Sequence, residues 1–344
     1  MSIYYVCSRK VIKVSVLLCL LALAVPSAAT FAAQEIPTAS PSAPPANAFV
    51  STEANPTSLH IGETALVSVR LNNIPVEGYK SAEFTCSYNP GLVEKSSLVV
   101  TDLFGADPVV AIHDPQPGSF IVAIAGANSH RAMVGGVAFT FSARGLQAGQ
   151  SAIHCAARVS RGDNLPIDLP GIGVDLTVLD IETPTATPFI PPTATQLPES
   201  PTPTPIANGA LGGQVLASKP VTVRLLDASQ VEITSVLANP DGTFSLAPLP
   251  GNYILVASAS GFLSYQGSVT ITAGNTTVFP AARLLAGDVD ANHVIDQFDA
   301  LTLGMSYLSS TPEAADLNSD GIIDFLDLER LAENYRQTGP TAWN

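Results

Sequence analysis

The sequence predicts a multidomain, mainly β protein that ends in a small all-α module. Three observations predict this: two linkers rich in proline and threonine divide the chain, apolar and polar residues alternate in the segments between them, and one short acidic stretch is repeated near the C-terminus. The 344 residues suffice for two or three ordinary domains. The net charge of −14, with no visible basic stripe, argues against a nucleic-acid partner.

The N-terminal segment, residues 1–33, has the pattern of an export signal. Basic residues precede the apolar run VSVLLCLLALAV, and the small residues of PSAATFAA follow it. We expect cleavage near Ala29 to Ala33, and hence a secreted, extracellular protein. The apolar run is somewhat short for the ~20 residues of a spanning helix. Retention of this run as a membrane anchor is the alternative.

Two linkers follow from composition, at residues 34–48 and 182–209. Both are rich in Pro, Thr and Ser and cannot bury a core, so we expect extended, semi-rigid spacers. They leave three modules, at residues 49–181, 210–284 and 285–344.

The module at residues 49–181 is predicted to be a β-sandwich. Apolar residues occupy every second position in TALVSVRL, GVAFTFSAR and GVDLTVLD, which is typical of half-buried strands. Cys86 and Cys155 lie in this module, and an exported protein meets conditions in which they form a disulfide. Two buried thiols are the alternative.

The module at residues 210–284 is predicted to be a second, smaller sandwich. PVTVRLL alternates in the same way, and NPDGTFSL places a tight Asp-Gly turn before a strand. A sandwich of this size has little spare surface for a deep active site.

Two acidic stretches stand near the C-terminus, DVDANHVIDQFD at 288–299 and DLNSDGIIDFLD at 316–327. Each has oxygen-bearing side chains at positions one, three, five, nine and twelve, and a residue at seven that would contribute its carbonyl. This is the ligand spacing of a calcium loop. We therefore expect two Ca²⁺ ions, held by Asp288, Asp290, Asn292, Val294, Asp296 and Asp299 and by Asp316, Asn318, Asp320, Ile322, Asp324 and Asp327.

Position six of a calcium loop needs a sharp turn, usually made by glycine. The second loop has Gly321, whereas the first has His293, a residue that tolerates positive φ better than most. The residue at position eight, Ile295 or Ile323, is expected to point into a core. An acidic disordered tail is the alternative, but apolar residues at the i, i+4 spacing of a helix follow each loop and disfavour it.

The duplicated loop-helix units, with Asp at position twelve and the opening AGDVD, resemble the type I dockerin module from residue 285 to about 335. The resemblance implies a calcium-folded module that binds a cohesin. It also implies that positions ten and eleven of each loop face this partner, namely Gln297, Phe298, Phe325 and Leu326. The Ser/Thr pair of many type I dockerins is absent here, which leaves the partner specificity open. Alternatively, Phe298 or Phe325 is simply part of the core.

The first sandwich resembles a cohesin, a nine-stranded jelly roll, from Ser58 to Leu179. SLHIGETALVSVRLNNIP, GYKSAEFTCSYNPGLVE and GGVAFTFSARGLQAGQSAI carry this resemblance. The second sandwich resembles carboxypeptidase regulatory-like, prealbumin-type domains.

Together the modules resemble a cellulosome-type scaffolding adaptor. The resemblance implies a non-catalytic protein whose cohesin binds dockerin-bearing proteins and whose dockerin binds a cohesin-bearing scaffold or anchor. Such assemblies degrade polysaccharide or sit at a cell surface. The sequence leaves open whether the cohesin accepts the dockerin of the same chain.

Two other function classes compete with this interpretation. An enzyme is disfavoured because the chain has no Gly-x-Ser-x-Gly motif and its five histidines show no triad order, and neither small sandwich obviously leaves a cleft for two carboxylates. Polysaccharide binding by the first sandwich is the remaining alternative. It is weakened because the one tryptophan, Trp343, lies in the C-terminal tail.

Overall fold

The computed structural model describes residues 47–180 and 209–343. The predicted export signal and nearly all of both predicted linkers lie outside the described residues. Every described residue belongs to one compact unit, Pro45–Asn344. None of the helices found among the described residues is both long enough and apolar enough to cross a membrane.

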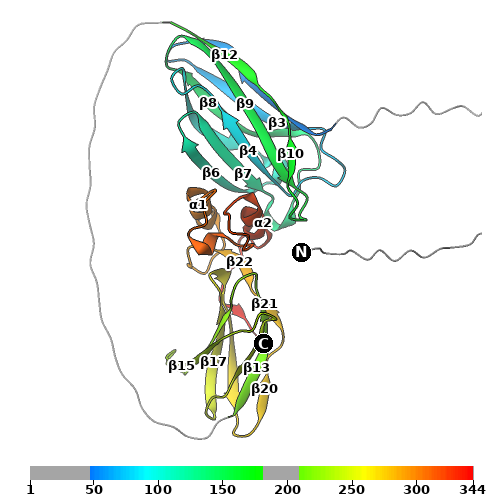
Figure 1. Ribbon diagram of the computed structural model, residues 1–344, viewed down its shortest axis with the longest axis vertical. Coiled ribbons are helices and arrows are strands. Elements are labelled where there is room, and N and C mark those ends of the chain that lie inside the picture. The colour runs from blue at the N-terminus through cyan, green and yellow to red at the C-terminus, as the bar shows by residue number, and fades with distance from the viewer. Residues whose placement is uncertain (1–46, 181–208, 344) are drawn as a thin grey trace, which may run out of the picture. The chain divides into compact units, whose positions relative to one another are not determined.

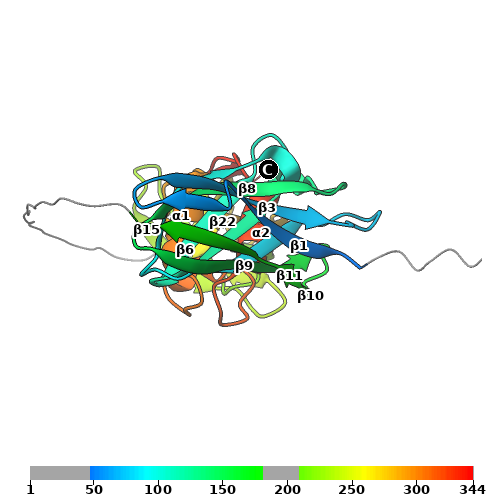
Figure 2. The same cartoon turned by 90° about the horizontal axis from the view of Figure 1, so that it is seen from above.

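The first module is a sandwich of two sheets, with only short 3₁₀ turns between its strands. These strands are β1 (Phe49–Asn55), β2 (Ser58–His60), β3 (Thr64–Asn72), β4 (Ser81–Ser87), β5 (Val93–Val100), β6 (Val109–Gln116), β7 (Ser119–Ala125), β8 (Gly136–Gly145), β9 (Gly149–Ser160), β10 (Ile167–Leu169), β11 (Gly171–Ile172) and β12 (Val174–Leu179). One sheet has the order β11-β1-β3-β8-β5, and the other has the order β2-β12-β9-β4-β7-β6, with β10 beside β9. Seen from above, β3 and β8 lie in one layer and β9 and β6 in the other (Figure 2).

The predicted alternation builds the core between these sheets. In β3 the apolar residues Ala65, Val67, Val69 and Leu71 are all fully buried. The cohesin resemblance implies nine strands, whereas the described part of this module has twelve, of which β2, β10 and β11 are three residues long or shorter. Cys86 of β4 and Cys155 of β9 lie opposite each other in adjacent strands and form a disulfide.

Strand β7 departs from alternation, because both of its faces are buried. Phe120, Val122 and Ile124 point into the core of the first sandwich. Ile121, Ala123 and Ala125 belong to a different apolar cluster, which includes residues from the C-terminal module. A strand covered on both faces reads as a continuous apolar run, and SFIVAIA is such a run.

The second module is also a sandwich of short strands. Within residues 210–284 they are β13 (Ala210–Leu216), β14 (Thr222–Leu226), β15 (Glu232–Leu237), β16 (Thr243–Leu246), β17 (Gly251–Ser258), β18 (Gly261–Leu263), β19 (Tyr265–Ile271), β20 (Thr276–Val278) and β21 (Ala282–Arg283). Two strands of the C-terminal module, β22 (Leu285–Asp288) and β23 (Thr341–Ala342), pair with them. One sheet has the order β16-β13-β20 with β21 beside β13, the other has the order β15-β14-β17-β19-β23, and β18 pairs with β22. The predicted Asp-Gly turn is present, with Gly242 at a φ of 81°.

The C-terminal segment contains two α-helices of nine residues each, α1 (Gln297–Met305) and α2 (Phe325–Glu333). Its end returns to the second sandwich, where β23 pairs with β19. The ring of Trp343 is 2% exposed and packs against Phe244 and Phe279, with centroids 5.8 and 5.1 Å apart. The second sandwich and the helical module therefore share one apolar core, and the helices lie beside β6 and β7 (Figure 1).

Candidate functional site

The two acidic loops have the same backbone. The first begins at Asp288, which is the last residue of β22. At position four Ala291 and Ser319 have φ values of 60° and 63°, and at position six His293 and Gly321 have φ values of 70° and 90°. Histidine thus adopts the left-handed turn that the second loop makes with glycine.

The carboxylate at position twelve closes each loop onto its own backbone. Asp299 is fully buried, and its Oδ1 accepts the N–H groups of Val289 and Asp290 at 2.7 and 3.1 Å. Its Oδ2 accepts the N–H of Asp296 at 2.9 Å. Asp327 does the same in the second loop, accepting from Leu317, Asn318 and Asp324.

These buried carboxyl groups resist ionisation when no cation is bound. Burial raises the pKa of Asp299 to about 6 and that of Asp327 to about 7, and nearby carboxylates add to both shifts, whereas the backbone hydrogen bonds oppose them. Burial also raises the pKa of Asp288 and of Asp324. A divalent cation would supply the positive charge that favours the ionised forms.

The residues present fit a hard divalent cation. In the first loop, carboxylate oxygens of Asp288, Asp290 and Asp299 all lie within 4.8 Å of one another. In the second loop the third position is Asn318, and Asp316 Oδ1 is buried without a hydrogen-bond partner. An orphaned buried carboxylate oxygen is costly, and coordination to Ca²⁺ would satisfy it.

The other predicted ligands lie on the same two loops. Asp296 and Asp324 cap the N-termini of α1 and α2, accepting from the N–H groups of Phe298 and Leu326. The remaining predicted ligands lie in Asx-type turns, in which each donates its backbone N–H to the side-chain oxygen of the residue two positions earlier; they are Asn292, Val294, Asp320 and Ile322.

The isoleucines at position eight join the two loop-helix units. Ile295 and Ile323 are both fully buried. The backbone of Ile323 pairs with Leu308 and Ser309 after α1, and the backbone of Ile295 pairs with Arg336 and Gln337 after α2. Each loop is thus tied to the segment that follows the other helix, so a cation at one loop would support both helices.

The helical module contacts the sheet of the first sandwich that contains β4, β7 and β6. We call this surface the docking face and define its apolar part by residues of β6 and β7 that share a cluster with the helices, namely Val109, Ala111, Ile121, Ala123 and Ala125. Three of these five residues are alanine, so little side-chain volume separates the sheet from the helices. A Cβ added at Gly304 of α1 would lie 3.0 Å from the carbonyl oxygen of Ile112, so the helix backbone approaches β6 closely.

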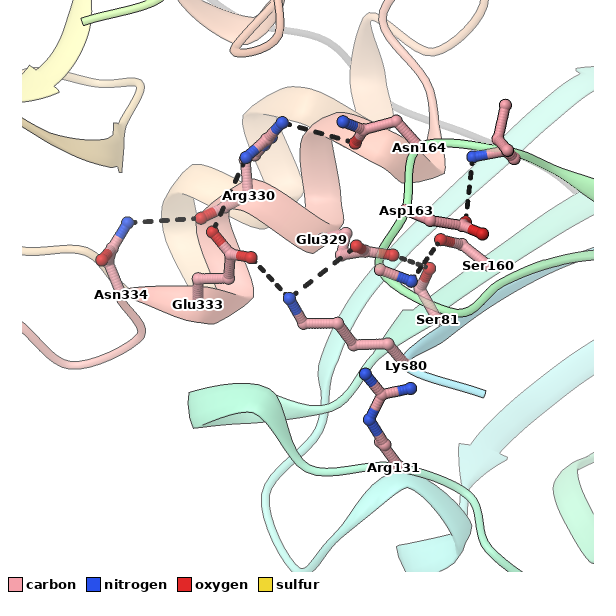
Figure 3. A network of polar contacts seen from close by, with 12 residues as sticks. Lys80, Ser81, Arg131, Ser160, Asp163, Asn164, Glu329, Arg330, Glu333 and Asn334 are labelled. Carbon is pink, nitrogen blue, oxygen red and sulfur yellow. Dashed lines mark hydrogen bonds and ion pairs between the residues drawn. The ribbon is translucent and has the colours of Figure 1, made fainter. Parts of the chain in front are cut away.

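A network of polar contacts also joins the first sandwich to α2 (Figure 3). Lys80, which precedes β4, places its Nζ 2.5 Å from Glu333 Oε1 and 3.8 Å from Glu329 Oε1 of α2. The hydroxyl of Ser81 donates to Glu329 Oε2 at 2.7 Å. Lys80 is 7% exposed and Glu329 is 4% exposed, so this ion pair is largely removed from water.

A second polar group lies around Glu83 of β4. Arg158 of β9 donates twice to Glu83, at 2.9 and 3.0 Å, and also reaches Asp324 Oδ2 at 3.3 Å. The hydroxyl of Tyr307 donates to Glu83 Oε2 at 2.5 Å. The guanidinium of Arg158 lies 5.1 Å from the ring centroid of Phe325, a distance typical of a cation–π contact.

The four predicted partner-contact residues differ in environment. Gln297 donates to the carbonyl of Val110 in β6 at 2.6 Å. Phe325 is fully buried and Leu326 is 7% exposed; both belong to the apolar cluster that the helical module shares with the second sandwich and with β6 and β7, and the ring of Phe325 also faces Arg158. Phe298 is 66% exposed, so it is not a core residue in this structure.

No local pattern in the sequence marks several residues of this contact. On the first sandwich these are Lys80, Ser81, Glu83 and Arg158, and on the helical module they are Gly304, Glu329 and Glu333. One signal was available in the sequence, because the uninterrupted apolar run of β7 indicates a strand covered on both faces.

The dockerin type I domain model matches residues 286–334. This match confirms the resemblance drawn from the duplicated loops, and the helical module is a C-terminal type I dockerin domain. No curated protein matches the chain.

Several solved cohesin structures are similar to the first sandwich. A cohesin module of a family 33 glycoside hydrolase from Clostridium perfringens is 13% identical, with 39% of this chain and 98% of that chain covered at a TM-score of 0.35. A type I cohesin from Pseudobacteroides cellulosolvens is 13% identical over 41% and 99% of the two chains at a TM-score of 0.32. A non-cellulosomal cohesin from Archaeoglobus fulgidus is 14% identical over 39% and 92% at a TM-score of 0.33.

Proposed function

We propose that this protein is a secreted, non-catalytic adaptor that joins partners through a cohesin and a calcium-dependent dockerin. The single observation that carries the proposal is the dockerin domain, whose two loops repeat the same backbone and the same buried carboxylate at position twelve. The first sandwich is the cohesin in this proposal, on the strength of its sequence resemblance and its two-sheet architecture.

Calcium supplies positive charge at each loop and thereby stabilises the helices that follow. The ligands would be the oxygens of Asp288, Asp290, Asn292, Val294, Asp296 and Asp299 in the first loop and of Asp316, Asn318, Asp320, Ile322, Asp324 and Asp327 in the second. Two ions per chain follow from two such loops. Among these ligands, Asp299 and Asp327 contribute most to calcium-dependent stability, because each is buried and accepts hydrogen bonds from the backbone at the start of its own loop.

The adaptor role follows from having both halves of a recognition pair in one chain. The cohesin would bind dockerin-bearing proteins, and the dockerin would bind a cohesin-bearing scaffold or anchor. Enzymes that degrade polysaccharide, or proteins of a cell surface, are the partners that this family of modules suggests. Trp343, the aromatic residue best suited to a sugar-binding platform, is buried, so the proposal does not give the chain a polysaccharide site of its own.

The middle sandwich holds the dockerin in place through strand pairing and a shared apolar core. Strands β22 and β23 attach the dockerin at both of its ends to strands of this sandwich. The prealbumin-type assignment for this sandwich rests on its sequence resemblance.

The test is thermal unfolding of the full chain in calcium and in a chelator. We expect calcium to raise the Tm of the transition that includes the helices, since a ligand that binds only the folded state stabilises it. Asp299→Asn should reduce this calcium-induced rise. The matched control is Asp175→Asn, an exposed residue of β12 outside both loops, which should leave the rise unchanged. An equal Tm in calcium and in chelator for the unmodified chain would refute the proposal.

A further inference from the structure

We infer that the dockerin of this chain occupies the docking face of its own cohesin, so that the adaptor exists in a closed, self-engaged form. This inference rests on the proposed function and names the occupant of that same face. The consequence is a competition, in which a foreign dockerin or a foreign cohesin has to displace an internal partner.

The apolar part of the docking face supports this occupant. Ile121, Ala123 and Ala125 point away from the core of the first sandwich, and they are 4%, 0% and 0% exposed because the dockerin covers them. Without a cover they would form an apolar stripe on the outer side of the sheet, the kind of surface that marks a protein-binding site.

The fit between the two surfaces is close at the backbone. Gly304 of α1 faces Ile112 of β6, and an added Cβ would lie 3.0 and 3.1 Å from the carbonyl oxygen and the amide nitrogen of Ile112. Gln297 also donates to the carbonyl of Val110. Strand β6 lies at the edge of its sheet, and α1 therefore covers an edge that would otherwise be open to other strands.

The charges of the two surfaces are complementary. Lys80 and Arg158 of the first sandwich meet Glu329, Glu333 and Asp324 of α2 and its cap. On the β6 side of the contact the sign is reversed, because Arg336 after α2 reaches Asp107 before β6 at 2.6 Å. Opposite signs on the β4 and β6 sides favour one placement of the dockerin on the sheet, which is how charge confers specificity on an interface.

The chain allows this contact to form within one molecule. Strand β12 ends at Leu179 and β13 begins at Ala210, and a connection of that length reaches up to ~100 Å when extended. A tether of this kind keeps the internal dockerin near its own cohesin and so raises its effective concentration. At micromolar protein concentrations the internal partner is therefore favoured over a second copy.

Zero-length cross-linking with a carbodiimide tests the inference on the full chain in calcium. The reagent joins an amine directly to a carboxylate, so Lys80 should become linked to Glu333, whose side chain is 35% exposed and therefore within reach of the reagent. Lys95 and Asp114, 2.5 Å apart and both within the first sandwich, are the internal control for the reagent. Chains labelled with ¹⁴N and with ¹⁵N are mixed before the reaction, so that the mass of each linked peptide pair shows whether it came from one chain or two.

We expect linked pairs of a single isotope only, with a yield that does not change on dilution. Gly304→Leu should lower the yield of the Lys80 link about tenfold through overpacking against β6. Leu301→Ala is the matched control, since Leu301 is 52% exposed on the same helix, and it should leave the yield unchanged.

Two outcomes would overturn the inference. Mixed-isotope pairs would show that the face is filled by a second copy. Absence of the Lys80 link while the Lys95 link forms would show that the face is open. Thermal unfolding of the same sample separates these failures from a failure of the proposed function, because a calcium-induced rise in Tm would survive both.

Discussion

Asp299 and Asp327 combine two features that normally exclude each other, complete burial and a carboxyl group. Each accepts three backbone N–H groups, which stabilises the ionised form, but burial outweighs these hydrogen bonds and raises the pKa of both residues. The loops are therefore shaped to hold a carboxylate that needs a cation beside it.

This conflict predicts a pH dependence for calcium-free protein. The folded-state pKa values of about 6 for Asp299 and about 7 for Asp327 lie above the ~3.9 of an exposed aspartate. The stability that protonated Asp299 and Asp327 give to the calcium-free folded state is therefore fully present below about pH 4, and it is lost as the pH rises through 6 to 7. In chelator, we expect a lower Tm at pH 8 than at pH 5, and Asp327→Asn should reduce this difference. A Tm in chelator that rises between pH 5 and pH 8 would contradict the argument.

At this scale the sequence predicts the loop residues well, because calcium ligands recur at fixed spacing within twelve residues. It also predicts that His293 occupies a glycine position. The sequence does not predict the polar contacts of Lys80 with Glu333 and of Arg158 with Asp324. Their partners are 253 and 166 residues apart, and no local pattern joins them.

Strand β23 is the element that most alters the predicted organisation. The sequence places Trp343 in a tail, whereas the structure places its ring between Phe244 and Phe279, and its indole N–H donates to the carbonyl of Pro280 at 2.9 Å. The strand is only two residues long, too short for a periodic signal to reveal it.

Removal of this ring should destabilise the shared core of the second sandwich and the dockerin. We expect Trp343→Ala to lower the free energy of unfolding by about 3–5 kcal/mol, the usual cost of deleting a buried large aromatic side chain. Chemical denaturation with matched m-values would measure it. Phe298→Ala is the control, because its ring is 66% exposed and its loss should change stability by less than about 0.5 kcal/mol. Equal effects of the two substitutions would refute the packing argument.

Strands with one buried face were predictable as elements, since alternation in β3 and β8 follows directly from burial on one side. Strand β7 shows the limit of that reasoning. Its unbroken apolar run indicates cover on both faces, but the run alone does not say what the cover is.

For the molecule as a whole, composition and patterning predicted the class of each module. Their mutual contact was not predictable, because surfaces that meet across a linker share no sequence period. The contact depends on small residues in β6 and β7, a glycine in α1 and complementary charges on the β4 and β6 sides, and each of these looks ordinary in its own segment.

Hydrogen–deuterium exchange on the full chain, with and without calcium, tests the central claim most directly. Removal of calcium should increase exchange in residues 288–335 and, at the same time, in β6, whose edge α1 covers. Strand β9 should stay protected, since it lies inside its sheet and is joined to β4 by the disulfide. Unchanged exchange in residues 288–335 would contradict calcium-dependent folding, and a change there that leaves β6 unaffected would contradict its coupling to the docking face.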